Sequence, residues 1–540
     1  MGGQSARGRN SVYIPPKPPS GEPYPLSPLI LTSLIVLVYT LATMPLLPAS
    51  MKQGLGPLSQ RSISSFSQLG GKPQNQFQFS WDHILANIGA PAGAAPGAVI
   101  ASPSKKDPDY FYTWTRDSAL TIMSLLPGIL PAKYLRPWDP IPPGKPGSMK
   151  AGYQPLLREY VSAQAELQLV PNPSGDLESG GLSEPKFHTD LTAFTGSWGR
   201  PQRDGPALRS LSLIPYAHYL MDTGEETYVR SALYNADATR APNSTIKNDL
   251  EEVAQRWSQR GFDIWEELEG RHFYTDFVSW RSLQAGSHFA RRMEDHGAAD
   301  WYAGKSAEVA AVLTSYWNDK LQAYVSSDAQ ALAGAKRDGL DAQVLLAFVH
   351  AGDSGARGAW SPASPRVLST LRAYVKSFKG LYKINPDASW TDGRLVGRYR
   401  EDIYDGVGTS RANPWFICTH AVSTVLYLAA AQLSVADSIV VTRESRAFWS
   451  DITGTEVPEG TEWEKGEPEF DTALRNVHRV ADRFAETAAT FYDSGHMAEQ
   501  IQKDTGKQTG ARDLTWSYAS FIEQERAKEA ALNATPSILV

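Results

Sequence analysis

The sequence predicts a mostly α-helical domain whose helices are joined by long loops. Apolar residues recur at helical spacing in several separate windows, and loops rich in Gly, Pro and Trp lie between them. Neither βαβ alternation nor a series of hairpins is present, so a sheet-based fold is not indicated. The helical windows are 120–130, 207–221, 306–324, 366–382, 415–433 and 471–491.

Individual segments support this prediction. In the window 306–324, Val309, Val312, Leu313, Tyr316 and Trp317 form one apolar stripe on a helix. Residues 127–146 contain seven prolines and cannot form a helix interior. Residues 452–468 are acidic and rich in Gly and Pro, which predicts a surface loop. We therefore expect helices with two inserted, non-helical stretches.

The N-terminal 50 residues read as a targeting segment rather than as part of the domain. A short basic stretch precedes the apolar run 29–47, which is about as long as a bilayer span requires. A signal-anchor and a cleaved signal peptide both fit. Residues 51–75 are predicted to form a linker, and 76–530 the main folded domain. We expect a secreted chain or a single-pass type II membrane protein, and the sequons at Asn243 and Asn533 fit such a secretory route.

Composition excludes several functional classes. The net charge of −6 argues against a nucleic-acid partner, which would require a basic face. The single cysteine, Cys418, allows no intrachain disulfide and is expected to be a small buried residue. No phosphate-binding loop, nucleophile elbow or ligand-spaced histidine cluster is visible. Carboxylates and aromatic residues, including 15 Trp and 23 Tyr, remain as the candidates for chemistry.

The densest acidic motif lies at 261–269 (GFDIWEELE). If this backbone is helical, Asp263, Glu266 and Glu267 share one face. Neighbouring anions and the apolar Trp265 would then raise the pKa of one carboxyl group, which could act as a general acid. An acidic cluster taken alone is more often a solvated helix face, but the flanking apolar residues favour a partly buried site.

A second motif, 109–117 (DYFYTWTRD), places Arg116 and Asp117 beside aromatic residues. Arginine donates to sugar hydroxyls, aspartate accepts from them, and aromatic faces cover the C–H surfaces of a pyranose. A structural ion pair under an aromatic cluster would give the same pattern. Trp198, Arg398, Trp415 and Trp516 repeat the combination of Trp or Arg with turn residues, and Glu499 is a lone carboxylate in GHMAEQ.

Seven blocks in a fixed order resemble the fungal glucoamylase family of inverting glycoside hydrolases. They cover roughly 87–520 and are YFYTWTRDS, NPSGDLESG, EPKFHTDLTAFTGSWGRPQRDGPALR, DIWEE, GRY-ED, NPWF and ARDLTWSYA. The resemblance implies an all-α fold, an (α/α)6 toroid of six inner and six outer helices, with long loops that form a pocket at one end. It also implies an α-glucan substrate such as starch, glycogen or maltooligosaccharides, and no metal or organic cofactor.

The same resemblance assigns roles to residues. Glu266 matches the general acid that protonates the leaving oxygen, and Glu499 matches the general base that activates water. Inversion requires the two carboxyl groups about 6.5–9.5 Å apart on opposite faces of the sugar. The residues that match substrate-binding positions are Tyr110, Trp114, Arg116, Asp117, Trp198, Asp263, Trp265, Glu267, Arg398, Trp415 and Trp516.

Departures from the family pattern bear on specificity. Gly510 replaces a serine whose hydroxyl can reach the base, and losing that hydrogen bond should raise the pKa of Glu499. Ala498 replaces a small polar residue, Phe194 replaces a tyrosine, and the loop 402–413 is longer than usual. Because the chain stops 24 residues after Trp516, with no C-terminal starch-binding domain, we expect weak action on raw starch granules.

Two alternative functions remain open at this point. One is a toroid hydrolase of another α-glucoside, such as trehalose or an isomaltose-type linkage. The other is a non-catalytic glucan-binding or regulatory protein, which would have no need for Glu266 and Glu499 together. We expect a monomeric enzyme that releases β-D-glucose from non-reducing ends, acting on α-1,4 bonds and more slowly on α-1,6 bonds.

Overall fold

The computed structural model describes residues 75–535 except 140, 143, 354, 356 and 357. The predicted signal segment and nearly all of the predicted linker lie outside the described residues. Within them, six helices form a closed ring in which each packs against the next and the last, α16, packs against the first, α3. The ring consists of α3 (Thr115–Leu125), α5 (Asp204–Asp222), α8 (Phe273–Arg292), α11 (Ala342–Ala351), α13 (Phe416–Ser434) and α16 (Thr515–Ala534).

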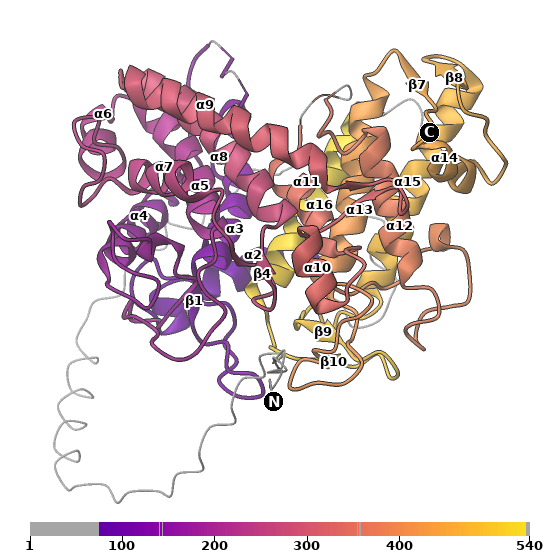
Figure 1. The fold of residues 1–540 in the computed structure, drawn as a ribbon, viewed down its shortest axis with the longest axis horizontal. Helices are drawn as coiled ribbons and strands as arrows, with labels where there is room; N and C mark the ends of the chain where they lie inside the picture. Colours follow the sequence, from indigo (N-terminus) through magenta and orange to yellow (C-terminus); the bar gives the residue numbers. More distant parts are fainter. Residues whose placement is uncertain (1–74, 140, 143, 354, 356–357, 536–540) are drawn as a thin grey trace, which may run out of the picture. The chain divides into compact units, whose positions relative to one another are not determined.

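A second layer of helices covers the ring. In Figure 1, α4, α7 and α9 lie outside one half, and α12 and α15 lie outside the other. The predicted (α/α)6 toroid is thus confirmed. The outer helices are α2 (Gln76–Ala86), α4 (Gln154–Leu169), α7 (Thr245–Arg256), α9 (His296–Leu313), α12 (Pro365–Ser377) and α15 (Pro468–Ala489).

Helix character follows position in the two layers. The inner helix α13 is buried along almost its whole length and is apolar on all sides, as a helix packed on all sides must be. It is long and apolar enough to span a bilayer, but 89% of that window is buried inside the domain. The outer helix α15 buries one stripe, which includes Phe470, Val477 and Phe484, and exposes charged residues elsewhere. Cys418 is a free, buried side chain on α13, as expected.

Strands are short within the described residues and occur as five antiparallel pairs. The pair β9–β10 belongs to the segment that carries Glu499, and β1 contains Trp114. In Figure 1, β1, β9 and β10 lie toward the same, lower edge of the domain. The pairs are β1 (Thr113–Trp114) with β2 (Lys186–Phe187), β3 (Gly261–Phe262) with β4 (Glu269–Gly270), β5 (Trp317–Asn318) with β6 (Ala323–Tyr324), β7 (Ser438–Val440) with β8 (Glu462–Glu464), and β9 (Gln500–Ile501) with β10 (Gln508–Thr509).

Three short helices, α6 (Glu226–Tyr228), α10 (Ala329–Ala335) and α14 (Arg446–Thr453), lie in the connections. Three helical windows were wrong in extent, because the helices end early: α3 ends at Leu125 and α12 at Ser377. In the window 306–324, α9 stops at Leu313 and Trp317 already belongs to β5. The stripe residues Tyr316 and Trp317 are therefore placed by a tight turn and a strand. Tyr316 still enters the core, where its ring packs edge-on against Phe273 at 5.6 Å.

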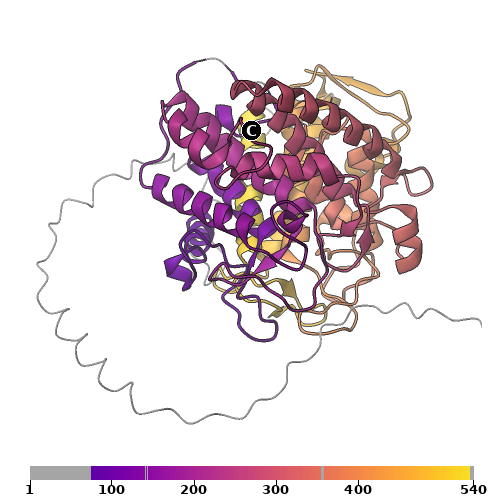
Figure 2. The same ribbon diagram turned by 60° about the vertical axis from the view of Figure 1, so that its left-hand side comes forward.

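The two ends of the domain meet where the ring closes. Figure 2 shows the C-terminal helix α16 running beside the N-terminal helices α2 and α3. The backbone N–H of Thr515 donates to Ala101 O at 2.9 Å, and the Thr515 hydroxyl donates to Ile100 O at 2.7 Å. These bonds satisfy a buried donor and hydroxyl at the start of α16 and fix its N-terminus beside the segment that precedes Tyr110.

Candidate active site

The predicted site residues gather at the N-terminal ends of the inner helices. Trp114 immediately precedes α3, whose first turn carries Arg116 and Asp117, while Trp415 precedes α13 and Trp516 lies in the first turn of α16. Ring closure brings these ends together from distant parts of the chain. Because a helix N-terminus carries partial positive charge, this arrangement favours carboxylates at the same end of the ring.

The acidic motif is a hairpin and not a helix, so the helical interpretation of 261–269 was wrong. β3 and β4 pair, and Asp263 N donates to Leu268 O at 3.0 Å across the turn. The buried Asp263 carboxylate accepts from the backbone N–H groups of Glu267 at 2.9 Å and Leu268 at 3.1 Å. Asp263 therefore shapes the turn that presents the two glutamates, which point to different partners.

Glu266 occupies a strained position at the tip of this turn. Its φ of +66° lies in the left-handed region, which costs a non-glycine residue about 1–2 kcal/mol. Its Oε1 accepts from Trp114 Nε1 at 2.7 Å and from Gln202 Nε2 at 3.0 Å, with Arg116 Nη2 at 3.7 Å. All three contacts are made to Oε1, so Oε2 is left for a substrate or a proton.

Arg116 and Asp117 are buried beside Glu266. Arg116 donates to Gln202 Oε1 and to Asp204 Oδ2, both at 2.9 Å, while its Nε lies 3.9 Å from Asp117 and has no hydrogen-bond partner. Burial raises the pKa of Asp117 to about 6, against the lowering effect of Arg116. A buried guanidinium nitrogen and a carboxyl group are thus available to sugar hydroxyls at one point.

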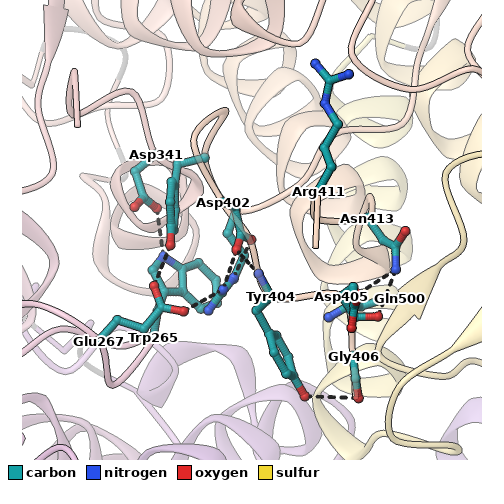
Figure 3. A network of polar contacts seen from close by, with 12 residues as sticks. Trp265, Glu267, Asp341, Asp402, Tyr404, Asp405, Gly406, Arg411, Asn413 and Gln500 are labelled. Atoms are coloured by element: carbon teal, nitrogen blue, oxygen red, sulfur yellow. Dashed lines mark hydrogen bonds and ion pairs between the residues drawn. The ribbon is translucent and has the colours of Figure 1, made fainter. Parts of the chain in front are cut away.

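Glu267 has other partners than Glu266, namely Arg398 and Arg337, and it lies beside Trp265 in Figure 3. It accepts from Arg398 Nη2 at 2.7 Å and from Arg337 Nη2 at 2.6 Å, and also from the Tyr399 hydroxyl. Burial would raise the pKa of Glu267, but the two guanidinium groups and the hydroxyl outweigh it, so its pKa is lowered. Glu267 is therefore held as an anion, which suits hydrogen bonding and not proton donation.

Arg398 is itself fixed from the other side by Asp402, to which it donates two hydrogen bonds of 2.7 Å. This bidentate pair is the strong geometry for an arginine and a carboxylate. The guanidinium lies 5.3 Å from the ring of Trp265 and 5.2 Å from that of Trp415. One arginine therefore ties the acidic hairpin to the aromatic side of the site.

Three tryptophans form a continuous aromatic surface. The ring of Trp265 lies 5.7 Å from that of Trp415 and is stacked at 6.3 Å on that of Trp516. Trp265 Nε1 donates to Asp341 Oδ1 at 2.9 Å, while the indole N–H groups of Trp415 and Trp516 are buried without a partner. Because buried donors are normally satisfied, these two N–H groups indicate a place for a polar ligand or water.

Trp198 lies on the Glu266 side, where its ring is 6.1 Å from that of Trp114. The ammonium group of Lys186 sits 3.6 Å from the Trp198 ring centroid and 4.3 Å from that of Phe194. Burial lowers the pKa of Lys186 to about 8, and the nearby Glu266 opposes this. Trp198 is thus held over a cation, which orients its indole.

Glu499 is 1% exposed and lies beside Tyr110. Burial raises the pKa of Glu499 to about 8, while Arg398 and hydrogen bonds from the hydroxyls of Tyr110 and Tyr404 act in the opposite direction. The two hydroxyls are 3.0 Å apart. Burial, and then the charge of Glu499, raise the pKa of Tyr110. The Tyr110 ring also lies 5.5 Å from that of Trp114, which donates to Glu266, so this one tyrosine connects the two glutamates.

Several residues of the site were not predicted. Gln202, which bonds both Arg116 and Glu266, and Asp402, the partner of Arg398, lie inside motifs that the sequence analysis quoted, so their motif membership was an available signal. Tyr404 lies in the loop judged unusually long. Asp341 and Arg337 gave no pattern in the sequence, because each is an isolated residue that the fold brings to the acidic hairpin.

One cavity and one group of potential metal ligands lie away from this cluster. A cavity of about 460 Å³ is lined by Trp138, His350 and Glu523 among others, and it includes neither Glu266 nor Glu499. One ligand atom from each of His83, His496 and Asp513 lies within 4.8 Å of the other two, outside the cluster described above. The groups gathered at the N-terminal ends of the ring are carboxyl, guanidinium, hydroxyl and indole groups.

The comparisons with known proteins identify the family and the fold. The family model described as Glycosyl hydrolases family 15 matches residues 78–525. This chain belongs to that family. It is 39% identical to Glucoamylase-1 of Schizophyllum commune over 460 residues, which are 84% of this chain and 73% of the relative. It is also 34% identical to a probable glucoamylase of Schizosaccharomyces pombe, covering 88% of this chain and 95% of the relative.

Solved structures of family members have the same fold. The family 15 glucoamylase from Hypocrea jecorina superposes with a TM-score of 0.75 at 32% identity, covering 84% of this chain and 71% of that one. The Saccharomycopsis fibuligera glucoamylase gives 0.72 at 29% identity, covering 84% and 94%. As a member of the family, this chain is a glycoside hydrolase, and the alternative of a non-catalytic protein is not supported.

Gly510 offers a direct test of the packing at Glu499. It has φ +75°, and a Cβ placed on it would lie 2.6 Å from Glu499 Oε2. Gly454 has the same conformation, φ +74°, with open space around it. We predict that both Gly→Ala variants lose about 1–2 kcal/mol of stability to left-handed strain. Only Gly510→Ala should also lose activity, by up to about 100-fold, because it displaces the carboxylate.

Thermal unfolding and steady-state kinetics on a soluble maltooligosaccharide measure the two effects separately. Equal activity in Gly510→Ala and Gly454→Ala would contradict this prediction, because Glu499 would then keep its position when a Cβ is added at residue 510.

Proposed function

We propose that this chain is an exo-acting, inverting glucoamylase that removes β-D-glucose from the non-reducing ends of α-1,4-linked glucans, and more slowly from α-1,6 bonds. The observation that carries the proposal is that Tyr110 connects the two glutamates: its ring lies 5.5 Å from that of Trp114, which holds Glu266, and its hydroxyl bonds Glu499. Inversion requires two carboxyl groups on opposite faces of the sugar, one to donate a proton and one to activate water.

Glu266 is the proposed general acid. Its Oε1 is held by Trp114 and Gln202, which fixes the carboxyl group and leaves Oε2 to carry the proton to the glycosidic oxygen. Glu267, one residue later, is unsuited to this step because two arginines keep it ionised. We assign Glu267 to hydrogen bonding of sugar hydroxyls next to the reacting bond.

Glu499 is the proposed general base. Burial raises the pKa of Glu499 to about 8, and Arg398 together with the hydroxyls of Tyr110 and Tyr404 opposes this rise, so these groups stabilise the ionised form that a base requires. An ionised carboxylate in this position can take a proton from water as the water attacks the anomeric carbon. No covalent sugar–enzyme bond forms on this route, so one displacement inverts the configuration.

The remaining residues would hold the terminal glucose. Arg116, Asp117 and Arg398 offer donors and an acceptor for its hydroxyls, and Tyr110 would stack beneath its ring. Trp198, Trp265, Trp415 and Trp516 would form the walls, with Trp114 supporting the acid. Asp263 acts through the turn that it caps. We also propose that the protein is a monomer. It is either secreted or anchored in a membrane, with its catalytic domain lumenal or extracellular.

The assignment of acid and base predicts a difference between two substrates. Maltose releases a sugar alkoxide that needs a proton, whereas α-D-glucosyl fluoride releases fluoride without one. Glu266→Gln should therefore lose roughly 10²–10⁴-fold in kcat/KM on maltose but far less on the fluoride. Glu499→Gln should lose activity on both substrates, because water must be activated in either case.

Glu269→Gln is the matched control, since Glu269 is an exposed glutamate on the same hairpin, and its kinetics should equal those of the parent. The assignment fails if Glu266→Gln loses equally on both substrates, or if Glu499→Gln keeps full activity on maltose.

The hydroxyls around Glu499 predict a change in pH dependence. A base must be ionised, so raising the pKa of Glu499 moves the acidic limb of kcat/KM to higher pH. Tyr404→Phe removes a donor to the ionised form and should shift this limb upward by about one pH unit or more, since such a bond is worth ~1.5–3 kcal/mol. Gly510→Ser should shift it downward relative to Gly510→Ala, because only serine adds a hydroxyl beside Oε2.

Tyr399→Phe serves as the control, because Tyr399 bonds Glu267 and not Glu499. The pH dependence of kcat/KM, measured across the acidic limb for each variant, tests this prediction. An unmoved limb in Tyr404→Phe would contradict the role of Glu499 as the ionised base.

A further inference from the structure

Two histidines and an aspartate converge beside the segment that carries Glu499. His83 lies on α2, His496 lies three residues before Glu499, and Asp513 lies just before α16. One ring nitrogen of each histidine and one carboxylate oxygen of Asp513 all lie within 4.8 Å of one another. These residues take no part in the proposed hydrolytic mechanism.

His83 is oriented as a metal ligand would be. Its Nδ1 lies 2.9 Å from the carbonyl oxygen of Phe79, and a carbonyl can only accept, so Nδ1 carries the proton. Nε2 is then left with a free lone pair. A backbone carbonyl on the other ring nitrogen is the usual companion of a metal-bound histidine, since it fixes both tautomer and ring orientation. The ring is also stacked on Phe79 at 4.0 Å.

His496 and Asp513 complete the set. His496 Nδ1 lies 2.7 Å from Asp513 Oδ1, which also accepts from the Tyr518 hydroxyl at 2.6 Å. The His496 ring packs edge-on against the rings of His83 at 5.1 Å and Phe79 at 5.0 Å. Its side chain is 48% exposed. The cluster is therefore pre-positioned by aromatic packing and open to an ion from solvent.

We propose that His83, His496 and Asp513 form a binding site for one divalent transition-metal ion of the Zn²⁺ type. Two imidazoles and one carboxylate with an open fourth position are a common donor set for zinc, whereas Ca²⁺ and Mg²⁺ prefer oxygen ligands alone. Zinc bonds of ~2.0–2.1 Å require ligand atoms closer together than 4.8 Å. Because the His496 ring is exposed, it can rotate and bring its nitrogen closer to the other two ligand atoms.

The ion would fasten the N-terminal helix to the catalytic segment. The Gln76 side chain on α2 already donates to Gly495 O at 2.8 Å, and Asn87 Nδ2 donates to Thr515 Oγ1 at 2.9 Å. His496 and Asp513 lie on the two sides of the segment that contains Glu499 and Gly510. A bound ion adds a link among α2 and both of these sides, so it should stabilise the folded enzyme against heat.

Calorimetric titration of the chelator-treated full chain with Zn²⁺ tests this site. One ion should bind per chain and raise the thermal midpoint, while Mg²⁺ at the same concentration should do neither. His83→Ala and His496→Ala should each weaken Zn²⁺ binding by more than the ~10–100-fold that loss of a ligand's hydrogen-bond partner costs. His288→Ala, which removes an exposed histidine from α8, is the control and should bind as the parent does.

Because His496 is half-exposed, its replacement by alanine should not disturb folding. Unfolding curves recorded without metal should confirm that the His496→Ala chain is folded. The proposal is overturned if the parent binds no Zn²⁺, if Mg²⁺ binds equally well, or if His83→Ala and His496→Ala retain the parent's affinity.

Discussion

Closure of the helical ring is the constraint on which the rest of the structure depends. α16 packs against α3, and Thr515 bonds the backbone at Ile100 and Ala101, so the last inner helix starts beside the first. This contact places Glu499, which precedes α16, next to Tyr110, which precedes α3. A two-carboxylate site therefore exists only in the closed ring, because Glu266 and Glu499 have no local relationship in the sequence.

The electrostatics of the site separates three glutamates that would otherwise be chemically alike. Arg398 and Arg337 pair with Glu267 and lower its pKa, so Glu267 stays ionised. Burial raises the pKa of Glu499 to about 8, against Arg398 and two tyrosine hydroxyls that favour its anion. Glu266 is fixed through one oxygen by an indole and an amide N–H, and its other oxygen is free of these contacts. Environment, and not residue type, gives each carboxyl group a different capacity.

Sequence reasoning was most reliable where one element's own pattern decides the structure. The apolar window 415–433 predicted α13 to within a residue at each end, because α13 is predominantly apolar and bounded by Trp415 and Val435. The same reasoning failed at 261–269, where Asp263 accepts backbone N–H groups and turns the chain into a hairpin. The helical spacing of the three carboxylates gives no sign of these hydrogen bonds to the Asp263 side chain, which compete with helix formation.

Contacts between distant segments were the other limit. Asp341 both caps α11, through the N–H of Gln343, and holds the indole of Trp265. Nothing near Asp341 in the sequence indicates the second contact. The resemblance to a known family supplied the residues that match its motifs, but partners such as Arg337 emerge only when the ring is assembled.

The anomeric form of the glucose first released from a soluble maltooligosaccharide tests the central account most directly. Proton NMR at early times, before mutarotation, distinguishes the two anomers. The account predicts β-glucose, since a single displacement by water inverts the α-linkage. α-Glucose would require a covalent intermediate and contradict the roles of both Glu266 and Glu499. Absence of glucose, with release from trehalose or isomaltose instead, would contradict the proposed linkage preference.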